Sequence, residues 1–173
     1  MFKLSNAPLI NAQQIDKRLE SLAQELKASD FDVILSALTG SYIFTADISR
    51  RIAKPNLQIA FIKASSYGDS TESQGKVKIS GIENLDIKGK RILIVDDILD
   101  TGNTMFSIVK TLTGLGPASI KACVLLNKES RRTVDYHADF VGFEIENKFV
   151  VGYGLDYAND YRTLPEIWTL EEV

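Results

Sequence analysis

The stretch Arg91 to Met105, RILIVDDILDTGNTM, constrains the fold more than any other part of the chain. It opens with Ile92-Leu93-Ile94-Val95, a β-branched, apolar run typical of a strand buried on both faces. Two adjacent carboxylates, Asp96 and Asp97, follow where we expect that strand to end. A turn of threonine and glycine then leads into a helix with apolar residues at helical spacing. This order predicts a ligand site at the carboxyl edge of a parallel sheet.

The residue types of the turn favour a phosphorylated sugar as the ligand. Gly102 lets the backbone turn tightly, so that successive N–H groups and the start of the helix face one point and can bind an anion. Thr101 and Thr104 add hydroxyl donors without charge. The three carboxylates, of which Asp100 is the third, suit sugar hydroxyls, a divalent cation or a proton to be abstracted. The alternative is an acidic turn before a helix, with Thr101 or Asn103 as its N-cap.

Composition limits the class of protein. We expect one domain over residues 1–173, with hydrophobic (45%) and charged (25%) contents typical of a soluble globular protein. The net charge of −3 argues against a nucleic-acid partner. No apolar run approaches the roughly 20 residues that span a bilayer, so no membrane partner is expected. The single cysteine, Cys123, cannot form an internal disulfide, and a cytoplasmic, reduced protein is the simple interpretation.

Strand and helix patterns alternate along the rest of the chain, which predicts an α/β domain with a mainly parallel sheet. A second strand runs into the small residues Thr39-Gly40-Ser41 before a helix, where the same anion-binding logic applies. The polar segment 65–75 is expected to be a mobile loop, either a linker or a lid that closes with Tyr67. The expected helices are 11–28 (capped by Asn11), 41–53 and 105–115, and the expected strands are 31–38, 57–64, 77–82, 92–95, 119–126 and 167–170, with 140–143 and 149–152 as a short strand pair.

Several of these stretches resemble a known family. VDDILDTGNT resembles the phosphoribosyl pyrophosphate signature of the type I phosphoribosyltransferases. The segment DFVGFEIENKFVVGYGLDYANDYRTLPEIW (139–168) is similar to the C-terminal stretch of their 6-oxopurine branch, typified by the hypoxanthine-guanine phosphoribosyltransferases. LTGSYIFTADI (38–48) resembles that branch's pyrophosphate loop, and Ser66-Tyr67 the Ser-Tyr pair of its mobile loop. The resemblance implies a type I phosphoribosyltransferase fold: a mainly parallel twisted sheet flanked by helices, a mobile loop (65–75) and a small C-terminal hood (128–173).

The resemblance also implies a reaction. Hypoxanthine or guanine would be joined at N9 to 5-phosphoribosyl 1-pyrophosphate (PRPP), giving IMP or GMP and pyrophosphate, with Mg²⁺ required. Asp96 and Asp97 would hold the ribose hydroxyls directly or through magnesium, and Asp100 would be the base near purine N7. The 5′-phosphate would be wrapped by the signature turn, which consists of Asp100, Thr101, Gly102, Asn103 and Thr104.

Roles outside the signature are implied in the same way. Thr39 and Gly40 would bind pyrophosphate, with Arg162 reaching in from the C-terminal segment. Ser66 and Tyr67 would act in the mobile loop. The base would be recognised by the hood through Lys128 at O6, Phe149 stacked on the ring and the Val150 backbone at the base edge, and Asp156 would bind a second magnesium through water.

Each role has a plainer alternative when the residue is taken alone. Lys128 at a strand end is commonly a surface lysine, Phe149 a core residue, and Asp156 and Arg162 a turn carboxylate and a surface ion-pair partner. At the level of function, two alternatives stay open: a PRPP-sensing regulatory protein of the same fold, and a xanthine-preferring phosphoribosyltransferase. The branch commonly forms homodimers or homotetramers, and a homo-oligomer is therefore expected.

Overall fold

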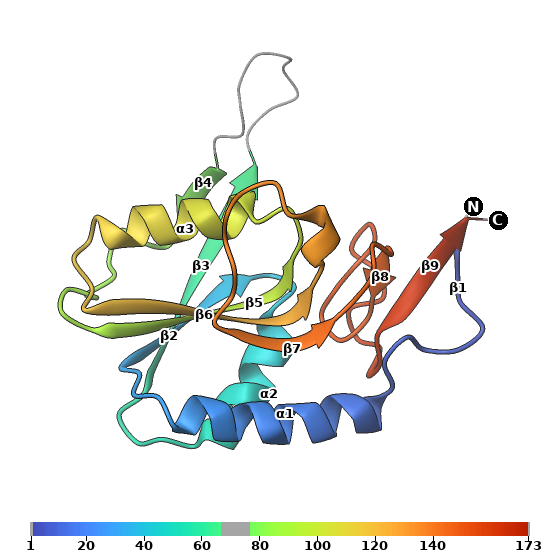
Figure 1. Cartoon of the computed structure of the whole chain (residues 1–173), viewed down its shortest axis with the longest axis horizontal. Helices are drawn as coiled ribbons and strands as arrows, with labels where there is room; N and C mark the ends of the chain where they lie inside the picture. Colours follow the sequence, from blue (N-terminus) through green and yellow to red (C-terminus); the bar gives the residue numbers. More distant parts are fainter. Residues whose placement is uncertain (1, 67–76, 173) are drawn as a thin grey trace, which may run out of the picture.

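The computed structural model describes residues 2–66 and 77–172, and its helices and strands alternate along the chain (Figure 1). In chain order the elements are β1 (Phe2–Leu4), α1 (Ala12–Lys27), β2 (Val33–Leu38), α2 (Tyr42–Ile52), β3 (Gln58–Ser66), β4 (Val77–Ser80), β5 (Arg91–Leu99), α3 (Asn103–Thr113), β6 (Ser119–Asn127), the 3₁₀ helix η1 (Glu129–Arg131), β7 (Phe140–Glu144), β8 (Val150–Val151) and β9 (Trp168–Glu172).

The larger sheet has six strands in the order β4-β3-β2-β5-β6-β7. Its strands pair in parallel except for β4, which is antiparallel to β3. The prediction of an α/β fold with a mainly parallel sheet is confirmed. The chain leaves β2 in one direction to β3 and reaches β5 on the other side, so the carboxyl ends of β2 and β5 meet where the strand order reverses. Open α/β sheets bind their ligands at such a point.

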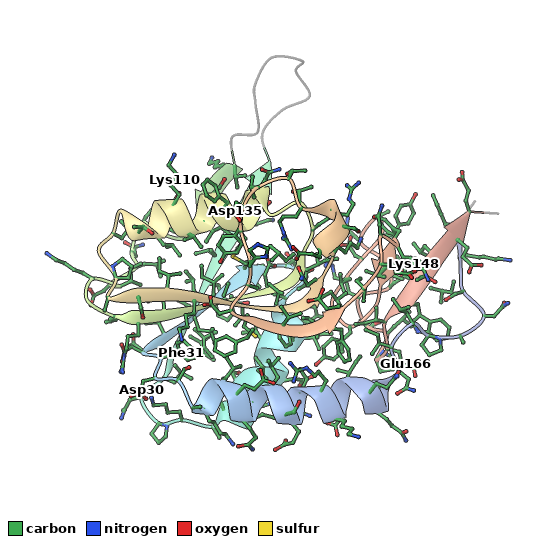
Figure 2. All side chains as sticks on the ribbon, viewed as in Figure 1. Asp30, Phe31, Lys110, Asp135, Lys148 and Glu166 are labelled. Atoms are coloured by element: carbon green, nitrogen blue, oxygen red, sulfur yellow. The ribbon has the colours of Figure 1, made fainter. Side chains whose placement is uncertain are left out.

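Helices cover both faces of this sheet, with α3 on one face and α1 and α2 on the other (Figure 1). Alternate residues of β5 point into the two hydrophobic cores, one on each face of the sheet. Ile92 and Ile94 pack in the cluster with α3, and Leu93 and Val95 in the cluster with α1 and α2. Side chains fill the space between the layers (Figure 2). The prediction that this strand is buried on both faces is therefore confirmed.

Helix α1 has the cap and the apolar face that its sequence predicts. The Asn11 side chain accepts a hydrogen bond from the Gln14 backbone N–H, and the Gln14 side chain accepts one from the Asn11 N–H, which together form a capping box. The face that packs on the sheet consists of Ile15, Leu19, Leu22, Ala23 and Leu26. No helix within 2–66 and 77–172 is long and apolar enough to cross a membrane.

A second, smaller sheet has three strands in the order β1-β9-β8. The prediction that 140–143 and 149–152 pair with each other is wrong. β7 pairs with β6 in the large sheet, whereas β8 pairs with β9 in the small one. β1, which the sequence analysis does not predict, pairs antiparallel with β9, so Phe2 lies opposite Glu172.

Two further predictions need correction. β5 does not end before Asp96 but continues to Leu99, because its pairing with β6 continues past the acidic residues. β3 extends to Ser66, which pairs with Val77, so the first two residues of the predicted loop belong to a strand. The remainder of that loop, with Tyr67, lies outside the described residues.

Candidate active site

Two cavities open at the carboxyl edge of the large sheet. The first has a volume of about 290 Å³ and lies between the end of β2, the end of β5 and the start of α3; the second, of about 260 Å³, lies between β5, η1 and the start of β8. Asp97, Ile98 and Asp100 line both cavities. The residues lining only the first include Thr39, Gly40, Asp96, Thr101, Gly102 and Thr104, and those lining only the second are Lys128, Phe149, Val150, Leu155 and Asp156.

This arrangement brings most of the predicted site residues together. Figure 2 places Lys148, the neighbour of Phe149, at the end of the molecule formed by the small sheet, and Asp30 at the opposite end. Because Asp97 and Asp100 line both cavities, a ligand that filled the two would have its junction at these residues.

The 100–104 loop begins α3 in a geometry that suits an anion. Gly102 is the N-cap of α3 and has φ +88°, a left-handed conformation that favours glycine. A Cβ at this position would also lie 2.8 Å from Cγ2 of Val134. The start of α3 thus lines the first cavity through Thr101, Gly102, Thr104 and Met105. The first backbone N–H groups of a helix have no partner within the helix and can bind an anion. Asn103 does not line either cavity, because its amide donates to the hydroxyls of Thr101 (3.2 Å) and Thr133 (3.1 Å).

The 38–41 loop between β2 and α2 is held by buried hydroxyl groups. Ser36 lies 2.9 Å from the hydroxyl of Ser41 and 2.8 Å from that of Thr45, and Ser41 donates to the Ala37 carbonyl at 2.6 Å. The peptide bond between Leu38 and Thr39 is cis. The hydrogen bonds of the Ser36 and Ser41 hydroxyls fix the loop where it borders the first cavity.

Gly40 allows this loop to approach the end of β5. A Cβ on Gly40 would lie 1.7 Å from Oδ2 of Asp97, so any larger residue here would have to displace the Asp97 carboxylate. The glycine thus lets the loop and this carboxylate lie in contact. Thr39, its neighbour, is exposed at the mouth of the cavity.

Two adjacent carboxylates in a half-buried setting are electrostatically costly. Burial raises the pKa of Asp96 well above its ordinary value of 3.8, and the neighbouring Asp97 raises it further. Burial also raises the pKa of Asp97. The positive charge of Arg162 lowers this pKa, but only weakly. A cation near this pair would relieve the repulsion.

The donor set suits a magnesium ion shared with a ligand. Asp96 and Asp97 supply hard oxygen atoms, which Mg²⁺ prefers. Within the described residues no three His, Cys, Asp or Glu side chains converge as a ready cage. Magnesium commonly binds through one or two carboxylates while water and phosphate oxygens complete its shell, so the residues present fit it.

Asp100, which lines both cavities, and Lys128, which lines the second, have different surroundings. Asp100 accepts a hydrogen bond from Nε of Arg131 at 3.1 Å, in a half-exposed ion pair. Lys128 is only 7% exposed, so it is not a surface lysine, and within the described residues no carboxylate lies within 4.0 Å of its ammonium. Burial lowers the pKa of Lys128, and the negative charge of Asp100 opposes this shift.

The hood presents an open aromatic ring beside a buried backbone. Phe149 is 52% exposed, so it is not a core residue, and its ring meets Tyr157 edge-on with centroids 5.7 Å apart. Val150 is buried beside it in β8. Arg162 does not line either cavity: its guanidinium donates to the Gly154 carbonyl at 2.7 Å and pairs with Asp156 at 2.9 Å.

The structure also adds residues that the sequence analysis does not single out. Arg131 pairs with Asp100, and the Thr133 backbone N–H donates to the Thr101 carbonyl at 2.9 Å. Tyr153 donates from its hydroxyl to Asp47 at 2.5 Å and so joins the hood to α2. The only available signal for the first two was the RRT run shortly after Lys128, which does not by itself indicate the direction of its side chains.

Replacing Asp96 by asparagine should stabilise the protein in the absence of magnesium and ligand. A folded-state pKa raised above the unfolded value means that the free energy of unfolding falls as pH rises from 3.8 through the raised pKa. Asp96→Asn removes that loss and keeps the side-chain oxygen that accepts the Asp97 N–H. We expect the Tm at pH 8 to rise by about 2–4 °C, as roughly 1 kcal/mol does in a domain of this size, with a smaller gain at pH 5.

The control for this experiment is Asp135→Asn, since the Asp135 side chain is fully exposed. Its Tm should match that of the unmodified protein at both pH values. An Asp96→Asn variant that melts at or below the temperature of the unmodified protein at pH 8 would contradict the interpretation of the carboxylate pair.

The chain is similar to known proteins over most of its length. The sequence model of the phosphoribosyl transferase domain matches residues 8–158. The hypoxanthine-guanine phosphoribosyltransferase of Aquifex aeolicus is 42% identical over 168 residues, which cover 95% of this chain and 94% of that protein. The hypoxanthine phosphoribosyltransferase of Salmonella typhimurium is 42% identical over 155 residues, with coverage of 90% and 83%. A crystal structure of a hypoxanthine-guanine phosphoribosyltransferase from Bacillus anthracis has a TM-score of 0.88 at 36% identity, covering 99% of this chain and 100% of that one.

Proposed function

Since the chain belongs to the phosphoribosyl transferase family, we propose that it is a purine-salvage enzyme that joins hypoxanthine or guanine, through N9, to C1′ of PRPP. The products are IMP or GMP and pyrophosphate. The observation that carries this proposal is the pair of cavities that share Asp97 and Asp100. One cavity suits a phosphorylated sugar and the other a flat base, so the shared residues flank the reacting carbon.

The first cavity takes the sugar and its phosphates. The 5′-phosphate lies against the free N–H groups at the start of α3 and the hydroxyls of Thr101 and Thr104. Pyrophosphate lies at Thr39 and Gly40, across the cavity. Asp96 and Asp97 are close enough to the junction to hold the ribose hydroxyls, as carboxylates readily accept hydrogen bonds from them. Arg162 can bind the pyrophosphate only after its ion pair with Asp156 breaks.

The second cavity takes the purine. The exposed ring of Phe149 offers a stacking surface, and the Val150 backbone lies at the base edge. The buried ammonium of Lys128 donates to O6, an acceptor that a 6-oxopurine provides. A 6-amino purine offers donors at that position and would leave the ammonium unpaired, which disfavours adenine. The Aquifex aeolicus relative is a hypoxanthine-guanine enzyme and the Salmonella typhimurium relative a hypoxanthine enzyme. Hypoxanthine and guanine are therefore both proposed as substrates.

The bond changes define the roles of the acidic residues. N9 of the purine forms a bond to C1′, the bond from C1′ to the pyrophosphate oxygen breaks, and the purine gives up one proton. Asp100 accepts that proton at N7. Positive charge that develops on the sugar is tolerated beside Asp96 and Asp97.

Magnesium would be held by Asp96 and Asp97 together with substrate oxygens, and a second ion by Asp156 through water. When bound, it would neutralise charge on the pyrophosphate leaving group. The proposal is supported by the hard oxygen donors and by the mutual repulsion of the pair, which raises the pKa of Asp96.

The assay that tests the function offers hypoxanthine, guanine, xanthine and adenine separately to the purified protein with PRPP and Mg²⁺. We expect turnover of hypoxanthine, guanine or both, no turnover of adenine, and loss of activity on addition of a chelator with recovery on excess Mg²⁺. Faster turnover of xanthine than of the other bases would replace the proposed substrate. Tight PRPP binding with no turnover of any base would favour a regulatory protein instead.

We also propose that the protein is a homo-oligomer that works in the cytoplasm as one domain. Two apolar side chains on β3, Ile59 (45% exposed) and Phe61 (53% exposed), are available for contact with a second copy. Light scattering coupled to size exclusion distinguishes a dimer from a tetramer.

A further inference from the structure

The segment that follows η1 folds back onto the 100–104 loop. Thr133 holds the loop through its backbone N–H, which donates to the Thr101 carbonyl at 2.9 Å, and through its hydroxyl, which lies 3.1 Å from the Asn103 amide. Val134 packs against the bare side of Gly102. The loop proposed to bind the 5′-phosphate is thus supported by residues about 30 positions further along the chain.

Arg132 is the most unusual member of this segment. Its side chain is 8% exposed. Nη2 donates to Oδ1 of Asn127 at 2.5 Å and makes a long contact of 3.4 Å with Glu129, but Nε and Nη1 are buried without a hydrogen-bond partner among the described residues. A buried charged donor left unpaired destabilises a fold. Stability alone therefore does not account for an arginine here.

The unpaired edge of the guanidinium lies against the loop. A Cβ on Gly102 would come within 3.4 Å of Nη1 and 3.0 Å of Cδ of Arg132. Gly102 lines the first cavity and Arg132 does not. The charge consequently lies behind the loop, separated from the cavity by about one layer of backbone.

The loop lacks positive charge of its own. Its sequence, DTGNT, contains no lysine or arginine, and three carboxylates line the same cavity: Asp96, Asp97 and Asp100. Arg131 is paired with Asp100, and Glu129, the acid nearest to Arg132, is more than half exposed and screened by water. A guanidinium in a water-poor layer keeps its field, and it stays charged at every working pH.

We propose, on the basis of the function proposed above, that Arg132 is a positioning residue for the 5′-phosphate. It supports Gly102 from behind and supplies through the loop the positive potential that the acidic cavity lacks. It does not touch the substrate. Its effect is therefore specific to the phosphate at the 100–104 loop and is not shared by pyrophosphate at Thr39 and Gly40.

Two anionic probes separate these sites. Ribose 5-phosphate and pyrophosphate are each measured as inhibitors against PRPP in the unmodified protein and in Arg132→Met, a variant with an apolar chain of similar reach. We expect the inhibition constant of ribose 5-phosphate and the KM for PRPP to rise about tenfold, as the loss of one nearby charge predicts. The inhibition constant of pyrophosphate, the KM for the purine and kcat should change less than about twofold.

Arg132→Lys keeps the charge without the planar fork and should recover at least half of the loss in ribose 5-phosphate binding on a logarithmic scale. If Arg132→Met does not fold, Arg132→Lys alone still tests the proposal, with an expected rise of about two- to threefold for ribose 5-phosphate and none for pyrophosphate.

The matched control is Arg18→Met. Arg18 is partly buried, with 26% of its side chain exposed, and donates to the carbonyls of Val141 and Gly142 at 2.7 and 2.8 Å, away from both cavities. This variant should lower the Tm and leave both inhibition constants unchanged. Equal weakening of the two probes in Arg132→Met, or no weakening of ribose 5-phosphate, would overturn the proposal. A protein whose unmodified form fails to turn over any purine would instead refute the proposed function.

Discussion

Replacing Asp100 by asparagine is expected to lower kcat by about 10²–10⁴-fold, which is the usual contribution of a general base. The variant keeps the shape of the side chain and its place between the two cavities but cannot accept the purine proton. The affinity for PRPP, measured by calorimetry, should change by less than about threefold, because the phosphates and ribose lie against other residues. The comparison of kcat with PRPP affinity therefore isolates the chemical step.

The ion pair with Arg131 needs its own control, since Asp100→Asn also breaks this pair. Arg131→Gln breaks it while keeping the carboxylate. If Asp100 acts as the base, Arg131→Gln retains most of kcat. An equal loss in both variants would assign the effect to the ion pair, and an unchanged kcat in Asp100→Asn would remove Asp100 from the role of base.

Replacing Lys128 by methionine is expected to lower kcat/KM for hypoxanthine and guanine by about 10²–10³-fold, the scale found when a preorganised donor to a developing anion is removed. The ammonium is buried and has no carboxylate within 4.0 Å in the described part of the chain, so its bond to O6 of the purine breaks no ion pair seen there. As the purine loses its proton, negative charge spreads to O6 and the bond to Lys128 strengthens. The affinity for PRPP alone should change little.

A matched control lies on β6, the strand that ends just before Lys128. Lys121 of β6 sits over the ring of Phe140 at 5.8 Å, away from both cavities. Lys121→Met should leave kcat/KM for either purine within about twofold of the unmodified value. Should Lys128→Met weaken PRPP as much as the purine, the lysine would be structural and base recognition would have to come from elsewhere in the hood.

The sequence predicted the fold class and the strand-turn-helix at residues 91–113 because both depend on local patterns. The β5–α3 stretch is continuous, so the order of apolar run, acids, glycine and helix was enough to place Asp97 and Asp100 at the sheet edge. The helix α1 was predicted for the same reason, since its cap and its apolar face lie within 18 residues.

Partners distant in sequence could not be predicted. Two short apolar runs, now β7 and β8, look alike as sequences, and only the topology decides that one joins β6 and the other β9. The end of β5 was misplaced because the hydrogen bonds of β6 extend the strand past its acidic residues, whatever their charge. Arg131 and Arg132 were not predicted because Arg131 ends a single 3₁₀ turn and Arg132 follows it, a stretch too short for any periodicity to indicate the side-chain directions.

The small sheet has a consequence for the order in which the molecule assembles. The described strands of the large sheet are complete by Glu144, so the half proposed to hold the sugar phosphates can form while the chain is still being synthesised. Among the described strands β8, which carries Val150, pairs with β9 alone, and β9 in turn pairs with β1, where Phe2 meets Glu172. Pairings between residues so far apart in sequence form slowly. The half proposed to bind the base therefore forms last. If the proposed roles hold, a nascent chain acquires its affinity for sugar phosphate before it can distinguish one purine from another.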